Sequence, residues 1–341
     1  MMMLPQSGLM HTALGLASLL FTYLSIRPLM PLMRRYALAR PNARSSHKVP
    51  TPQGGGIPIV LAIAFGLFVA LGLGLVPDAD KPVAWVLAFS VLALAVLGLF
   101  DDIKPLPVLP RLGVQFGVSI ALMIATPSDI LLFHGVVPLI IERALVVIAL
   151  VWMINLTNFM DGIDWITVAE FVPLSGALVV AALIGIASPI IGIVAVLLLG
   201  GLLGFAPYNK PVAKLFLGDV GSLPIGLVAG YALYRYGAST HIVSALILAL
   251  YPLTDATLTL VRRVLRGEKI FEAHRSHFYQ QATNNGYRVI EVVTHVAFAG
   301  AIFAALSLTI ATTTSALLIG VMAVLALIGV TGLLRRFVTK I

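Results

Sequence analysis

The stretch VAWVLAFSVLALAVLGLFDD, residues 83–102, consists of a long uncharged and mostly apolar run that ends in two aspartates. A helix of about 20 apolar residues crosses the ~30 Å hydrocarbon core of a membrane. A carboxylate at the centre of such a helix costs about 2.5–3.5 kcal/mol on insertion scales. The aspartates therefore mark the point where a membrane-spanning helix reaches the membrane surface.

The composition of the whole chain agrees with this interpretation. Of its 341 residues, 60% are hydrophobic and only 11% are charged, which is more apolar surface than a soluble core of this size would bury. The absence of cysteine excludes disulfides and thiolate metal sites, so any metal must be bound by oxygen or imidazole. The net charge of +8 would fit nucleic-acid binding, but basic residues of a membrane protein are expected first in cytoplasmic loops.

Hydrophobic segments of spanning length recur along the chain and predict an all-α polytopic membrane protein with a single domain, residues 1–341. The first segment is longer than a signal-peptide core, so we interpret it as a retained helix. The eleven predicted spans lie near residues 8–30, 56–76, 83–100, 112–126, 139–157, 167–187, 189–206, 221–236, 241–260, 291–311 and 315–334.

The distribution of basic residues predicts the orientation of these helices. An odd number of spans places the termini on opposite sides, and 19 of the 22 Lys and Arg residues fall on the side of the C-terminus. This asymmetry predicts a cytoplasmic C-terminus and an external, periplasmic N-terminus. The cytoplasmic segments that would carry the active site are then residues 34–55, 101–111, 158–166, 207–220 and 261–290.

Five aspartates would meet on this cytoplasmic face. The third, fifth and seventh predicted spans all run into the cytoplasm. They are followed by Asp101 and Asp102, by Asp161 and Asp164, and by Asp219. Carboxylates without cysteine suit a hard cation such as Mg²⁺, which keeps open positions for phosphate oxygens. The alternative is that the aspartates are helix caps or solvated boundary charges.

Glycines and two basic segments complete the predicted site. Gly54 to Gly56, Gly218 and Gly221 permit close approach of the backbone to an anion, although ordinary loop or helix-packing geometry would also use them. The segment RPNARSSHKVPTPQGGG at residues 40–56 contributes side chains that can meet phosphate or only set the topology. These are Arg40, Arg44, His47 and Lys48.

The second basic segment lies between residues 261 and 288 and contains His274, Arg275 and His277. These donors can bind a diphosphate or offset phosphoryl charge, whereas a plain solvated loop is the alternative. Two histidines without a third nearby ligand make an incomplete zinc site. Asp255 is an intramembrane acid and so a functional candidate, with pairing to Arg262 as the alternative.

Five ordered motifs between residue 40 and about residue 282 carry a family resemblance. RSSHKVPTPQGGG, GLFDD, NFMDGID, FLGDVGS and HRSHFYQQA together resemble the polyprenyl-phosphate N-acetylhexosamine-1-phosphate transferases, glycosyltransferase family 4. The resemblance implies a bacterial inner-membrane enzyme that transfers a sugar-1-phosphate from a UDP-N-acetylamino sugar to undecaprenyl phosphate and releases UMP. It implies Mg²⁺ as the cofactor, with Mn²⁺ as a substitute.

The resemblance also implies roles for individual residues. The catalytic positions would be Asp101, Asp102, His274, Arg275 and His277. Asp219 would bind Mg²⁺ together with Asp102. The substrate-binding positions would be Lys48, Asn158, Asp161, Asp164, Asn209 and Phe216.

Several alternatives stay open. The phospho-N-acetylmuramoyl-pentapeptide transferase branch has a run of adjacent histidines, whereas Arg275 and Ser276 separate the pair here. The form HRSHFYQQA more resembles enzymes that initiate O-antigen or related polysaccharides. A groove between the fourth, fifth and ninth spans would hold the prenyl chain, and a homodimer agrees with the resemblance. Direct attack and an aspartyl intermediate are both chemically reasonable, and a secondary transporter of an anionic solute is the alternative of another class.

Overall fold

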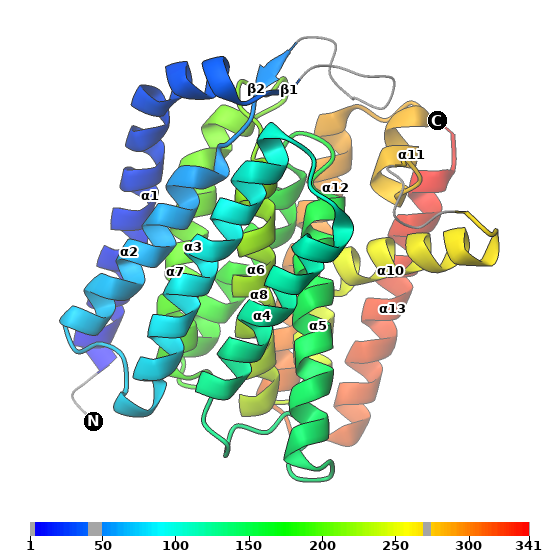
Figure 1. The fold of residues 1–341 in the computed structure, drawn as a ribbon. Helices are drawn as coiled ribbons and strands as arrows, with labels where there is room; N and C mark the ends of the chain where they lie inside the picture. Colours follow the sequence, from blue (N-terminus) through cyan, green and yellow to red (C-terminus); the bar gives the residue numbers. More distant parts are fainter. Residues whose placement is uncertain (1–3, 40–49, 269–273, 341) are drawn as a thin grey trace.

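The computed structural model describes residues 4–39, 50–268 and 274–340, which form a helical bundle (Figure 1). Besides its helices, this part of the chain contains a small antiparallel pair of strands, β1 (Leu38–Ala39) and β2 (Thr51–Pro52), and the 3-10 turn η1 (Asp78–Asp80). The helices are α1 (Leu4–Tyr36), α2 (Gly56–Gly72), α3 (Lys81–Ile103), α4 (Val108–Ala125), α5 (Leu139–Met160), α6 (Ile166–Leu183), α7 (Pro189–Asn209), α8 (Asp219–Ser239), α9 (Ile242–Leu248), α10 (Leu250–Leu265), α11 (Phe278–Asn284), α12 (Val289–Ala311) and α13 (Ala316–Val338).

The protein is an all-α, multi-pass membrane protein, as predicted. Each of the eleven predicted segments coincides with a helix or with the pair α9–α10. In the described part of the chain, eight helices are long and apolar enough to cross a membrane, or nine if the bent pair counts as one span. The apolar helix α2 has only 17 residues, and α8 is not among the eight. The number of eleven spans therefore stays a prediction.

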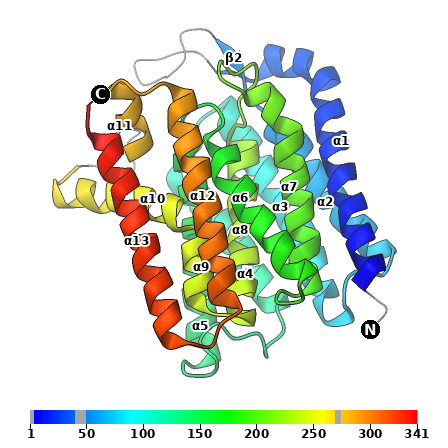
Figure 2. The same ribbon diagram turned by 180° about the vertical axis from the view of Figure 1, so that it is seen from behind.

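The predicted ninth span is not one straight helix. Helices α9 and α10 meet at Ala249 and are bent by 78° relative to each other. Pro252 follows in the first turn of α10 and has no N–H to donate to Leu248, so a continuous helical ladder is interrupted there. Helix α10 consequently projects sideways from the bundle, as Figures 1 and 2 show.

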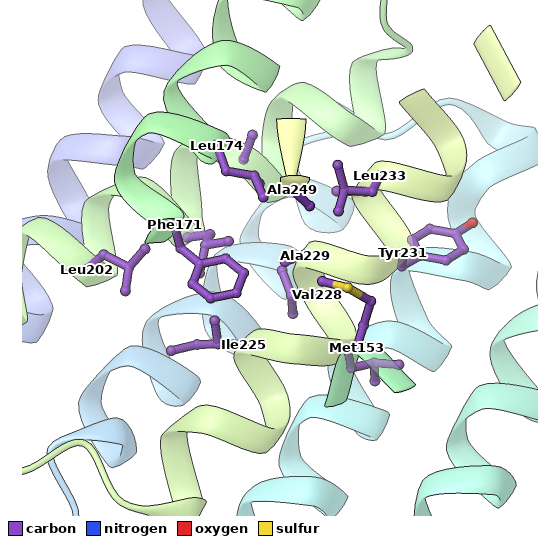
Figure 3. Close-up of a cluster of buried hydrophobic side chains, with 14 of the residues drawn as sticks. Met153, Phe171, Leu174, Leu202, Ile225, Val228, Ala229, Tyr231, Leu233 and Ala249 are labelled. Carbon is purple, nitrogen blue, oxygen red and sulfur yellow. The ribbon is translucent and has the colours of Figure 1, made fainter. Parts of the chain in front are cut away.

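Helix α8 occupies the centre of the bundle. It packs against α2, α3, α5, α7 and α9, and its residues are buried from Val220 to Gly237. Figure 3 shows a part of this core, where Ile225, Val228 and Ala229 of α8 lie close to Met153 and Phe171 of neighbouring helices. Side chains that face outward on the surrounding helices are largely apolar, as a lipid environment requires.

The two ends of the bundle differ in chemistry. Helix α1 begins at one end, and α13 finishes at the other, where β1, β2 and α11 also lie (Figure 1). At the end where α1 begins, Arg235 of α8 pairs with Asp80 at 2.7 Å, and both side chains are buried. Burial of two charges is costly unless they are paired, so this contact fixes the last turns of α8.

Candidate active site

The start of α8 is held by a carboxylate from α3. Asp102 Oδ1 accepts a hydrogen bond from the backbone N–H of Asp219 at 2.9 Å, and its Oδ2 accepts one from Val220 at 3.2 Å. The preceding Gly218 has φ +76° and ψ 168°, a conformation that essentially only glycine adopts. This turn aims the free N–H groups of α8 at Asp102, which caps the helix in the way anions do.

A guanidinium group connects the other two aspartates. Arg111, in the first turns of α4, places Nη1 2.8 Å from Asp101 Oδ2 and Nη2 3.9 Å from Asp219 Oδ2. The second oxygen of Asp101 accepts the backbone N–H of Leu106 at 2.6 Å. Arg111 thus offsets part of the negative charge where the ends of α3 and α8 meet.

The amide of Asn158, from α5, completes this cluster. Its Nδ2 donates to Asp219 Oδ1 at 2.6 Å and to Ser222 Oγ at 3.0 Å. Asn158 therefore holds one oxygen of the Asp219 carboxylate, and Arg111 lies near the other. Helices α3, α4, α5 and α8 each contribute to a polar cluster that we call the aspartate cluster: Asp101, Asp102, Arg111, Asn158 and Asp219.

The loop between α5 and α6 carries the second pair of acids. Asp161 Oδ1 accepts the hydroxyl of Thr167 at 2.5 Å. Desolvation raises the pKa of Asp161 to about 7, and the charges of Asp102 and Asp164 act in the same direction against the bond from Thr167. A Cβ atom at Gly162 would collide with the hydroxyl of Tyr279, so glycine lets this loop pack directly on α11.

Asp164 binds the loop that follows α7. Its Oδ2 accepts the backbone N–H of Ala213 at 2.9 Å. Beside it, Asn209 Oδ1 accepts the backbone N–H of Trp165 at 2.8 Å, and its Nδ2 donates to the carbonyl of Leu215 at 2.9 Å. Asp164 and Asn209 are both buried, and they tie the two loops together.

The glycine-rich segment after β2 lies beside the segment that leads into α8. Gln53 forms a parallel bridge with Phe216, the backbone N–H of Gly55 donates to the Phe216 carbonyl at 2.9 Å, and the Gln53 side chain donates to the Asp102 carbonyl at 2.9 Å. A Cβ at Gly56 would overlap the backbone of Gly221. Close packing of α2 against α8 therefore accounts for Gly56 and Gly221, which is the helix-packing alternative of the sequence analysis.

Asp255 of α10 holds the segment that carries the histidines, residues 274–277, which we call the histidine segment. His277 Nδ1 lies 3.1 Å from Asp255 Oδ1, and the rings of His274 and His277 stack with centroids 5.0 Å apart. Asp255 thus pairs with His277, whereas Arg262 lies over the ring of Phe278. Burial lowers the pKa of His274 to about 4, helped by the charges of His277 and Arg263, so His274 is neutral at pH 7.

A groove of about 550 Å³ opens from the aspartate cluster to the histidine segment. Its walls come from α4, α5 and α10, which are the fourth, fifth and ninth helices of the prediction. Apolar side chains form most of the lining, and the polar groups gather at one end. The lining residues are Val108, Arg111, Leu112, Phe116, Ile148, Val151, Trp152, Asn155, Asn158, Phe159, Ala256, Leu260, His274 and His277.

Comparison with known proteins identifies this arrangement. The sequence profile of glycosyl transferase family 4 matches residues 84–237, a range that includes Asp101, Asp102, Asp161 and Asp219. The chain belongs to glycosyl transferase family 4. The matched range covers the central part of the bundle, from α3 to α8.

Curated relatives extend over most of this family 4 chain. A decaprenyl-phosphate N-acetylglucosaminephosphotransferase of Mycobacterium tuberculosis is 28% identical over 316 residues, 82% of this chain and 77% of the relative. A probable undecaprenyl-phosphate N-acetylglucosaminyl 1-phosphate transferase of Bacillus subtilis is 27% identical, with coverage of 76% and 74%. A phospho-N-acetylmuramoyl-pentapeptide-transferase of Synechococcus elongatus is 31% identical, with coverage of 65% and 64%.

The structure brings most of the predicted site residues of this family 4 protein to one end of the bundle. Asp219 is hydrogen-bonded to Asp102 and Asn158, and Arg111 connects it to Asp101. His274 and His277 line the same groove as Asn158. Asp164 lies in the loop between α5 and α6, Asn209 is the last residue of α7, and Phe216 lies in the loop between α7 and α8. Half-buried Arg275 follows His274 and precedes His277 in the sequence. Lys48, with Arg40, Arg44 and His47, lies outside the described residues.

Sequence reasoning misses the role of Arg111 and leaves the partner of Asp255 open. Arg111 was counted only as a charge that sets topology, although a lone arginine at the start of an apolar helix beside paired aspartates is a usable signal. Asp255 was a candidate, but its partner His277 is 22 residues away and could not be told from Arg262. In both cases the contact depends on the bend or packing of helices.

The donor set of the aspartate cluster suits a hard divalent cation. In the described ranges no group of three or more His, Asp or Glu side chains is arranged to hold a metal. Mg²⁺ needs only one or two carboxylates, because substrate phosphates and water supply its other ligands. Arg111 pairs with both Asp101 and Asp219 but offsets only one of their negative charges. A bound metal ion would offset the remaining negative charge. The residues therefore fit Mg²⁺.

Proposed function

We propose that this protein transfers N-acetylamino-sugar-1-phosphate from a UDP-sugar to undecaprenyl phosphate, forming an undecaprenyl-diphosphate sugar and UMP. The observation that carries the proposal is the aspartate cluster at the polar end of an apolar groove. The names of the Mycobacterium tuberculosis and Bacillus subtilis relatives support a polyprenyl phosphate as acceptor and N-acetylglucosamine as the first donor to test.

The shape and chemistry of the groove suit the lipid acceptor. Apolar residues such as Phe116 and Trp152 would surround the prenyl chain, and Arg111 at the polar end would bind its phosphate. A guanidinium group forms forked hydrogen bonds to phosphate oxygens and keeps its charge at any physiological pH. His274 and His277 line the same groove and would contact the diphosphate of the donor from the other side.

The reaction needs one bond made and one broken. An oxygen of the lipid phosphate attacks the phosphorus that carries the sugar, and the bond from this phosphorus to the oxygen of UMP breaks. Mg²⁺ bound by Asp219, with Asp101 or Asp102, would supply positive charge between the phosphates and stabilise the departing UMP. Asn158 keeps the Asp219 carboxylate in place, which makes positioning the main contribution of these side chains.

We favour direct attack over an aspartyl intermediate. Both oxygens of Asp102 already accept backbone N–H groups of α8, and both oxygens of Asp101 are engaged by Leu106 and Arg111. A carboxylate with both oxygens held in this way is a poor nucleophile. The lipid phosphate needs little help from a base, because a phosphate monoester has a second pKa of about 6 and is largely dianionic at pH 7.

The membrane placement belongs to the same proposal. We place the aspartate cluster on the cytoplasmic face of the bacterial inner membrane, since most Lys and Arg residues lie on that side and UDP-sugars are cytoplasmic. The N-terminus would then be periplasmic. The product would start O-antigen or a related surface polysaccharide, and a muramoyl-pentapeptide is the alternative donor because a relative with that name also matches.

The test uses purified protein, undecaprenyl phosphate, Mg²⁺ and a panel of UDP-N-acetylamino sugars. We expect UMP release that requires both lipid and metal, together with a lipid product of the corresponding mass. Asp219→Asn should abolish release, whereas Asp129→Asn, an exposed aspartate outside the site, should not. Absence of UMP release with every donor, from folded protein, would refute the proposal.

A further inference from the structure

Asp255 is a fully buried carboxylate that accepts hydrogen bonds from five groups. It lies in α10, next to the bend, and has no exposed surface. All of its donors come from α10 itself or from the histidine segment and the first turn of α11. They are Nδ1 of His277 at 3.1 Å, the backbone N–H groups of Phe278 at 3.0 Å and Tyr279 at 3.2 Å, and the hydroxyls of Tyr251 at 3.1 Å and Thr259 at 3.3 Å.

This network ties His277 and the start of α11 to α10, in addition to the packing of α11 against α12 and α13. Helix α11 has only seven residues, too few to be stable without tertiary contacts. The Asp255 carboxylate accepts the first two backbone N–H groups of α11, and it also contacts the ring of His277, the residue before α11. Movement of the carboxylate would therefore move His277 as well.

The contact also determines which ring nitrogen of His277 is available. With Nδ1 as the donor to Asp255, Nε2 is the nitrogen left to meet a ligand. The ring lines the groove that also contains Arg111 and Asn158. His277 can thus reach substrate phosphate oxygens only while Asp255 holds the ring in this orientation.

We propose that Asp255 is a positioning residue for the transfer reaction and acts through His277. The inference rests on the proposed function, because it assumes that the groove holds the phosphates of lipid and sugar nucleotide. Asp255 itself is fully buried and does not line the groove, so it does not touch substrate. Its contribution to the rate should therefore exist only when the imidazole is present.

A double-mutant cycle tests this dependence. Kinetic constants for UMP release are measured for the wild type, Asp255→Asn, His277→Ala and the double variant, in full-length protein. Loss of a partner that orients a functional histidine typically costs 10- to 100-fold, so we expect a fall of this size in kcat for Asp255→Asn. In the His277→Ala background the same change should alter kcat by less than about threefold, because neighbouring residues that act as a unit are not additive.

Matched controls separate positioning from folding. Thr259→Val and Tyr251→Phe each remove one hydrogen bond to the same carboxylate but leave the imidazole contact, so both should keep kcat within about threefold of wild type. If Asp255→Asn does not fold, Asp255→Glu takes its place in the cycle, since its longer side chain keeps the charge and displaces the contact. Multiplicative losses in the double variant would overturn the inference.

The cycle also distinguishes this inference from the proposed function. If wild-type protein releases no UMP, the proposed reaction fails before any variant is compared. If the wild type is active and the losses multiply, the reaction stands and the positioning role of Asp255 falls. Non-additive losses with intact controls support both.

Discussion

Replacing Gly218 by alanine should damage the site through the backbone that leads into α8. The residue has φ +76° and ψ 168°, and a side chain held there costs about 1–3 kcal/mol. The added Cβ would lie 2.5 Å from Asp102 Oδ2 and 3.2 Å from the backbone nitrogen of Gly54, so the carboxylate has to move.

The displaced carboxylate adds a loss of similar size. Asp102 accepts the backbone N–H groups of Asp219 and Val220, and a hydrogen bond to a charged group contributes about 1.5–3 kcal/mol. Loss of one such bond together with the backbone strain predicts a destabilisation of roughly 2.5–6 kcal/mol. Because Asp219 follows directly, UMP release should also fall at least about tenfold.

The matched control is Gly117→Ala in α4. A Cβ at Gly117 meets no atom within 4 Å, and alanine favours a helix interior over glycine by about 0.5–1 kcal/mol. Thermal unfolding in one detergent and UMP release are measured for both variants. A melting temperature of Gly218→Ala equal to that of the control, with more than half of the wild-type activity, would refute this account of the turn.

Three further changes test other parts of the structure. Arg111→Ala should lower UMP release about 100-fold with little change in melting temperature, and Arg111→Lys should recover only part of the activity. A large fall in the melting temperature of Arg111→Ala would contradict a role at phosphate. Glu170→Gln should raise the melting temperature, because both oxygens of this buried carboxylate are without a hydrogen-bond partner in the described structure; a fall would show that its charge is needed. Because the pKa of Asp161 is raised to about 7, its carboxyl group stays protonated in the folded state up to about pH 7, so stability should decrease as pH rises from about 4 to 7. Asp161→Asn should flatten this dependence of the melting temperature on pH, and an unchanged slope would contradict the assignment.

The meeting of distant aspartates was predictable from sequence because membrane insertion restricts where charges can lie. The prediction that Asp102 and Asp219 emerge at one end of the bundle is confirmed by the hydrogen bond from the Asp219 backbone to Asp102. Asn158, 61 residues before Asp219, also donates to the Asp219 carboxylate. Hydrophobic runs and the distribution of basic residues carried that information. The cytoplasmic assignment of this end remains a prediction.

Details that depend on packing were outside the reach of the sequence. The bend at Ala249 follows from Pro252, but its angle of 78° depends on how α10 meets α5 and α13. Gly56 and Gly221 suggested anion binding, whereas the backbones of α2 and α8 meet at these positions. A sequence pattern indicates that a glycine is needed but not which neighbour approaches it.

The central position of α8 explains why this helix is not among the eight that are long and apolar enough to cross a membrane. Helices that face lipid must be apolar, and eight helices of the described chain are long and apolar enough to cross a membrane. Helix α8 is shielded by α3, α5 and other neighbours, so it can carry Asp219 at its start and Arg235 near its end at no cost from lipid contact. A charged segment of spanning length among apolar ones is therefore itself a signal: it indicates the centre of the bundle, where backbone N–H groups and carboxylates can meet away from lipid.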